Sequence, residues 1–143
     1  MLVVLGALWV GCSALVAAAD GAPSSAADRI ATPAGANRIA IDAPDGAKAR
    51  KPYNITLHGF ARRSATAFLF VDYLGCAKSL RVERQRARNA SYSYAVKGDF
   101  AKVSGWKSST AGVDHACAYL VAFRSGTLLA AARMSFQIAR RHR

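Results

Sequence analysis

The stretch ACAYLVAFRSGTLLAAARMSFQI, residues 116–138, decides the fold. Its two apolar runs flank Ser125-Gly126, a turn sequence, so the stretch predicts a β-hairpin. A two-residue loop gives the second strand a polar face, with Arg133, Ser135 and Gln137, and an apolar face opposite it. We therefore expect Cys117 to point into the core. The apolar pairs expected on that inner face are Cys117 with Met134, Tyr119 with Ala132, Val121 with Ala130, and Phe123 with Leu128.

Upstream of this hairpin, the chain falls into short β-rich runs between turn residues, which is the pattern of a sandwich or barrel. Pro44-Asp45-Gly46 and Lys97-Gly98-Asp99 predict turns, and Arg62-Arg63-Ser64 predicts a loop. Residues 67–73 are apolar at nearly every position, as in a central strand covered on both faces. The sequence therefore predicts an all-β fold, a single antiparallel β-sandwich of about seven strands. The expected strands are residues 38–42, 53–60, 67–73, 91–96, 100–106, 116–124 and 127–138.

One segment departs from this pattern. Residues 78–89 are rich in good helix formers and carry Arg81, Arg84, Arg86 and Arg88. The segment predicts either a short helix or a basic loop at the edge of the sandwich.

The N-terminus has the pattern of an export signal. An apolar run over residues 2–16 is closed by Ala17-Ala18-Ala19, although no Lys or Arg precedes it. We expect residues 1–19 to be a signal peptide; an uncleaved anchor over residues 2–19 and lipidation at Cys12 are the alternatives. The protein is then secreted or extracytoplasmic. The expected organisation is a flexible linker over 20–37, the β-sandwich domain over 38–139 and a basic tail over 140–143.

The cysteines fit an oxidising setting. After removal of the signal, Cys76 and Cys117 remain, and an even pair in an exported domain predicts a disulfide that closes a loop of about 41 residues. We expect no metal and no cofactor, because zinc needs four ligands and Asp114-His115 has no paired ligand spacing.

From these features the chain resembles the immunoglobulin-like β-sandwiches of exported bacterial proteins. The resemblance covers residues 38–139 and rests on the number of strands, the disulfide and the late hairpin that contains Ala116-Cys117-Ala118-Tyr119-Leu120-Val121. Cys76 follows the third expected strand, whereas the first cysteine of antibody-type domains lies in the second, so the order of the strands stays open. The resemblance implies a scaffold for binding, adhesion or structural roles.

The charge of the chain is strongly positive, at +12 from twenty Lys and Arg against eight Asp and Glu. Such a surface attracts anionic polymers or a membrane surface, and arginine binds phosphate and carboxylate bidentately. The alternative is that the charge only keeps the protein soluble. The candidate polyanion-binding residues are Arg62, Arg63, Arg81, Arg84, Arg86, Arg88, Arg140, Arg141 and Arg143.

Two functional interpretations therefore remain. The first is a secreted or cell-envelope binding or structural module whose partner is an unknown protein or glycan. The second is a polyanion-binding envelope protein that acts through its arginine-rich segment. No enzymatic activity is expected, because Asp114-His115 has no nucleophile partner and Ser104-Gly105-Trp106-Lys107 lacks the companion motifs of serine acyl transferases. Asn54 and Asn89 begin N-glycosylation sequons.

Overall fold

The computed structural model describes residues 35–42, 44, 46–86 and 91–140. The expected signal segment and most of the expected linker lie outside these residues. Within them, no helix has the length and apolar character needed to cross a bilayer. The elements are β1 (Arg38–Asp42), β2 (Pro52–Asp72), α1 (Leu80–Arg86), β3 (Ser91–Lys107), β4 (Gly112–Ala122) and β5 (Leu128–Ile138).

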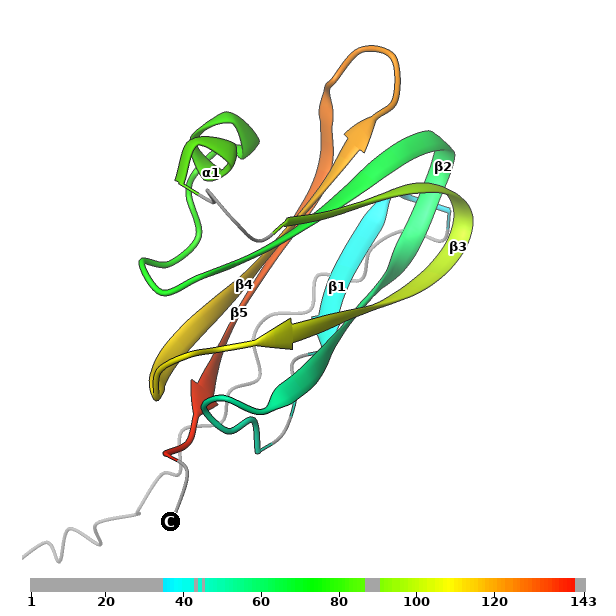
Figure 1. The fold of residues 1–143 in the computed structure, drawn as a ribbon. Coiled ribbons are helices and arrows are strands. Elements are labelled where there is room, and N and C mark those ends of the chain that lie inside the picture. The colour runs from blue at the N-terminus through cyan, green and yellow to red at the C-terminus, as the bar shows by residue number, and fades with distance from the viewer. Residues whose placement is uncertain (1–34, 43, 45, 87–90, 141–143) are drawn as a thin grey trace, which may run out of the picture. The chain divides into compact units, whose positions relative to one another are not determined.

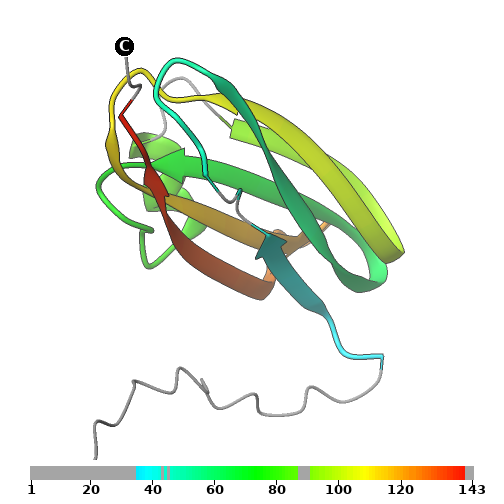
Figure 2. The ribbon, with the colours of Figure 1, turned by 90° about the horizontal axis from the view of Figure 1, so that it is seen from below.

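The strands form one antiparallel sheet that curls into two layers (Figures 1 and 2). β2 lies at its centre. The first half of β2 pairs with β1, the second half pairs with β4, and β3 follows the other edge of β2 along both halves. β5 pairs with the free edge of β4. We call the layer with β1 the first layer and the layer with β4 and β5 the second layer.

The prediction of seven strands is wrong, because two pairs of expected strands are continuous. Residues 53–60 and 67–73 fall in β2, apart from Tyr73, and residues 91–96 and 100–106 both fall in β3. Ala61 pairs with Gly98 and Ala65 pairs with Val96, so residues 62–64 of β2 face only Lys97 of β3. The expected loop at Arg62-Arg63-Ser64 is therefore a bulge, at which both strands bend from one layer into the other without losing their pairing.

The expected register of the last hairpin is also wrong. Cys117 pairs with Arg133 and Tyr119 with Ala131, one residue away from the predicted partners. Two features cause the shift. The connecting loop has four residues, Phe123 to Gly126, since the Ala122 amide donates to the Thr127 carbonyl at 2.9 Å, and Leu129 is an extra residue at a bulge in β5.

The main core lies between the two layers and follows the alternation of the strands. In the first layer, Tyr53, Ile55 and Leu57 of β2 are buried, as the sequence predicts. The core side of β4 carries Ala116, Ala118 and Leu120, and not Cys117. Cys117 is fully buried, but on the outer face of the second layer, with Phe70, Tyr119 and Val121. The second half of β2 and strand β4 are thus covered on both faces.

The two halves of β3 close one open side between the layers. The Tyr92 hydroxyl donates to the Gly105 carbonyl at 2.8 Å, and the Tyr94 hydroxyl shares a hydrogen bond with Ser104 at 2.8 Å. The ring of Trp106 meets Tyr92 edge to face, with centroids 5.1 Å apart. These contacts tie the beginning of β3 to its end, so the edge of the sandwich is held by side chains as well as by the continuous strand.

Candidate functional site

Three connections meet at the end of the sandwich where β2 and β3 bend. They are the bulge at residues 62–64, the bend at 97–99 and the loop at 123–126, which we call together the loop end. The Phe123 amide donates to the Ser64 carbonyl at 3.2 Å, and the Arg62 amide donates to Asn37 Oδ1 at 2.8 Å. Gly98 has a φ of 70°, which the tight bend requires. The backbone of the loop end is therefore held by hydrogen bonds between segments far apart in sequence.

A pocket of about 840 Å³ opens at the loop end. Its floor is a row of small side chains on the core face, because Ala65 pairs with Val96 on one side and with Ala122 on the other. Phe123, with 68% of its surface exposed, stands beside this floor. The pocket exists because these residues are too small to fill the end of the core. We call it the loop-end pocket; its lining residues are Arg63, Ser64, Ala65, Ala95, Val96, Lys97, Ala122, Phe123, Arg124 and Ser125.

The charged side chains that line the loop-end pocket are all positive. Arg63, Lys97 and Arg124 line it, each from a different segment, and among the described residues no carboxylate belongs to its lining. The nearby Asp99 is already engaged, because it forms an ion pair with Arg38 at 3.0 Å. Three cations around an apolar floor make this pocket suited to a ligand that carries negative charge.

The predicted arginine cluster is not gathered into one patch. Arg62 and Arg63 lie in the bulge of β2, whereas Arg81, Arg84 and Arg86 lie on α1, which Figure 1 shows away from the bend of β2. The described part of the tail contributes one more residue, the exposed Arg140 after β5. Arg88, Arg141 and Arg143 lie outside the described residues.

Two of the helix arginines make contacts within the fold. The guanidinium of Arg84 lies over the ring of Phe68, 4.4 Å from its centroid, and Nη1 of Arg86 donates to the Gly75 carbonyl at 3.4 Å. These contacts orient both side chains along the outer face of the second layer. The helix itself confirms one of the two expected forms of the segment 78–89 over residues 80–86.

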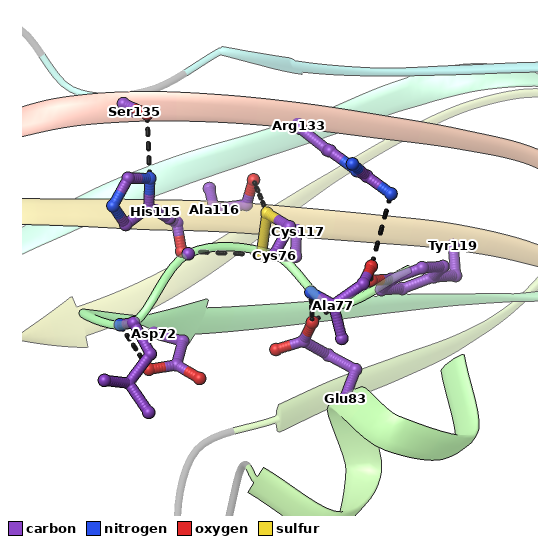
Figure 3. The surroundings of a disulfide bond; sticks show 12 residues. Asp72, Cys76, Ala77, Glu83, His115, Ala116, Cys117, Tyr119, Arg133 and Ser135 are labelled. Carbon is purple, nitrogen blue, oxygen red and sulfur yellow. Dashed lines mark hydrogen bonds between the residues drawn. A yellow bond between two sulfur atoms is a disulfide. The ribbon is translucent and has the colours of Figure 1, made fainter. Parts of the chain in front are cut away.

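The disulfide and a buried acid fasten α1 to the second layer (Figure 3). Cys76 is bonded to Cys117, as expected from the count of cysteines, with Cα atoms 5.5 Å apart. Glu83 of α1 is fully buried, and its Oε2 accepts hydrogen bonds from the Ala77 amide at 2.5 Å and from the Tyr119 hydroxyl at 3.1 Å. Nη2 of Arg133 donates to the Ala77 carbonyl at 3.2 Å. The segment from Cys76 to Glu83 is thus held covalently and by a buried polar network.

Tyrosine ionisation should report on this network. Burial raises the pKa of Tyr119 to about 12 from its ordinary 10.0, assisted by the Glu83 carboxylate and opposed by Arg133 and Arg86. Burial, with Asp114, likewise raises the pKa of Tyr53 to about 12. The unfolded chain loses these protons first, so we expect stability to be complete below pH 10 and to fall as the pH rises toward 12.

Ultraviolet absorbance of phenolate tests this expectation. Two of the five tyrosines should ionise near pH 12 in the folded chain, and all five near pH 10 in denaturant. Tyr119→Phe should remove one of the two late ionisations. If all five ionise together in the folded chain, the hydroxyl of Tyr119 is not buried as described.

Sequence reasoning missed Lys97, Phe123 and Arg124 as site residues. They come from connections far apart in sequence, so no local run of charge marks them, and only the pairing of β2 with β3 and β4 brings them together. Glu83 could have been singled out from the sequence, because it is the only acidic residue among the four arginines of residues 81–88. Of the two sequon residues, Asn54 is exposed on β2 and Asn89 lies outside the described residues.

The fold is a curled antiparallel β-sheet that forms two layers. No protein-family model and no curated protein matches the sequence. The structure is similar to a crystal structure of a CARDB domain from Pyrococcus furiosus, in complex with di-metal ions, at 10% identity over 72% of this chain and 87% of that chain, with a TM-score of 0.48. It is also similar to a solution structure of the same domain, at 10% identity over 73% of this chain and 93% of that chain, with a TM-score of 0.44.

Proposed function

We propose that this chain is a secreted or cell-envelope binding module of the β-sandwich class whose loop-end pocket holds a negatively charged partner. The observation that carries the proposal is that Arg63, Lys97 and Arg124 line one pocket, with no carboxylate beside them in the part of the chain that the structure describes. The net charge of +12 adds a long-range attraction for the same kind of partner. No catalytic step is part of the proposal.

Export is supported by two independent features. The apolar run over residues 2–16 ends in small residues, as a cleaved signal does. The Cys76–Cys117 disulfide is of a kind that persists in oxidising compartments and is rare in the cytosol. The same features suit a chain anchored by residues 2–19, and in either case the sandwich faces the extracytoplasmic side.

The pocket is proposed in preference to the arginines of α1 because of its shape. The guanidinium of Arg84 lies over the ring of Phe68, and that of Arg86 donates a hydrogen bond to the Gly75 carbonyl, so both groups already have partners in the fold. The cations of the loop end surround a concave apolar surface instead, which is the usual form of a ligand site.

The test is binding of the full chain to polyphosphate at about 50 and about 200 mM salt. The triple variant Arg63→Ala, Lys97→Ala, Arg124→Ala should bind roughly tenfold or more weakly at the lower salt, and its dependence of log K on log salt should be shallower by about 2, because three phosphate contacts and their counterions are lost. Thermal unfolding should be little changed, since within the described residues these three side chains form no ion pair and belong to no core cluster.

The matched control removes the same charge from another place. Arg81→Ala, Arg84→Ala, Arg86→Ala takes three arginines from α1, and it should retain most of the affinity and nearly the full salt dependence. The reverse result, with loss of binding in the α1 variant alone, would assign the site to the arginine-rich segment. Equal small losses in both variants would mean that the net charge acts as a diffuse background.

A further inference from the structure

The floor of the loop-end pocket demands more of a ligand than charge. Ala65 and Val96 at the base of the pocket are buried in the main core, so the apolar surface that a ligand can cover belongs to the half-buried Ala122 and to Phe123. Phe123, a large apolar side chain, projects beside the floor with 68% of its surface exposed. Apolar surface of this kind is stabilised when a ligand removes it from water.

A purely polar anion would satisfy only part of this site. Phosphate groups along a polymer can reach Arg63, Lys97 and Arg124, but they leave Ala122 and Phe123 in contact with water. A ligand that joins an anionic group to an alkyl chain satisfies both parts, with the charged group between the cations and the chain against Phe123. The volume of about 840 Å³ lies in the range of pockets that hold small organic ligands.

We propose that the loop-end pocket binds an anionic amphiphile, a single alkyl chain bearing a carboxylate or phosphate group. Arg63, Lys97 and Arg124 hold the anionic group, and the chain lies against Ala122 and Phe123. The inference rests on the proposed function, since it assigns the partner of the same pocket. It differs in requiring the apolar floor, which polyphosphate does not need.

The experiment measures binding of the full chain to decanoate, hexanoate and decyl maltoside by calorimetry below their micelle-forming concentrations. A fully buried methylene strengthens binding about fourfold, and a half-buried one about twofold, so decanoate should bind at least about tenfold more tightly than hexanoate. Decyl maltoside has the chain without the charge, and it should bind far more weakly than decanoate.

Two variants separate the pocket from any other apolar part of the chain. Ala122→Phe fills the pocket from its floor and should weaken decanoate binding at least tenfold, and by a larger factor than it weakens polyphosphate binding, which depends on the three cations. Ala131→Phe adds the same ring at an exposed position of β5 and should change neither. Every variant keeps residues 2–16, so an effect confined to Ala122→Phe cannot come from that run.

The outcomes distinguish the amphiphile from the proposed function. Binding of polyphosphate without decanoate, equal binding of decanoate and hexanoate, or decanoate binding unchanged in Ala122→Phe would each overturn the amphiphile and leave the anionic partner in place. Loss of both ligands in the Arg63, Lys97, Arg124 variant supports both proposals. Retention on phosphatidylcholine vesicles that contain lysophosphatidylglycerol, an anionic lipid with one chain, abolished by Ala122→Phe, would place the amphiphile in a membrane, and binding of decanoate alone would make it a free molecule; either result supports the inference.

Discussion

Removal of the Cys76–Cys117 disulfide is expected to lower the free energy of unfolding by about 4 kcal/mol. The bridge spans a separation of 41 residues, and the entropy of closing a loop of that length in the unfolded chain accounts for the figure. A loss of this size is a third or more of the stability of an ordinary domain. Urea unfolding of Cys76→Ala, Cys117→Ala beside the parent chain measures it, with Cys12→Ser in both to remove the third thiol.

The reduced parent chain is the matched control, because it keeps both side chains and loses only the bond. Reduction and double replacement should destabilise the domain to a similar extent, since both release the same loop. Thiol titration should find no reactive thiol in the oxidised Cys12→Ser chain. Two reactive thiols under native, oxidising conditions would show that the bridge does not form, and a loss below about 1 kcal/mol would show that the unfolded chain is already compact.

Replacement of Glu83 by alanine is expected to cost about 3 kcal/mol. The change leaves the buried Ala77 amide without its acceptor and opens a cavity under the segment that carries Cys76. Tyr119 keeps its second acceptor, the Ala77 carbonyl at 2.8 Å, so its hydroxyl is not stranded. Urea unfolding gives the cost, and hydrogen exchange of the Ala77 amide should show that the loss of protection begins at this place.

Glu83→Gln separates the hydrogen bonds from the charge. The amide oxygen can still accept from the Ala77 amide, and the shape of the side chain is kept, so we expect a loss of about 1 kcal/mol or less. Oε1 of Glu83 has no partner among the described residues, and the glutamine removes the cost of burying a charge there. If Gln and Ala cost the same, the buried carboxylate is held by its ionic surroundings and not by the hydrogen bonds named above.

The sequence predicts the faces of the strands better than the number of strands. The alternation in residues 53–57 and the apolar run at 67–72 place the correct side chains inside, because burial acts on each strand separately. The continuity of β2 through Arg62-Arg63-Ser64 cannot be predicted from the alternation of side chains. Three polar residues in a row predict a loop, even where the strands on both sides of them continue to pair with the same neighbour. The hairpin register fails for a related reason: its loop length and one bulge shift the partners without changing the pattern.

The disulfide follows from the sequence and the site does not. If the predicted signal segment with Cys12 is removed, Cys76 and Cys117 have only each other as partners within the chain, so their pairing follows from the count of cysteines. The loop-end pocket depends on small apolar residues such as Ala65 and Ala122, which do not stand out in the sequence as site residues. It also depends on cationic residues that are far apart in the sequence. An arginine run draws attention because its members are neighbours along the chain, whereas a pocket is defined by neighbours in space.

Because β2 and β3 continue from one layer into the other, they fix the width of the mouth of the loop-end pocket. In a sandwich whose layers are joined by flexible loops, the layers can part slightly to admit a larger ligand. Here Ala65 and Val96 lie on strands that continue into the opposite layer, so widening the mouth would require breaking the ladder of backbone hydrogen bonds on either side of the bend. For the ligand proposed above, we therefore expect selection by the thickness of the molecule at the mouth of the pocket.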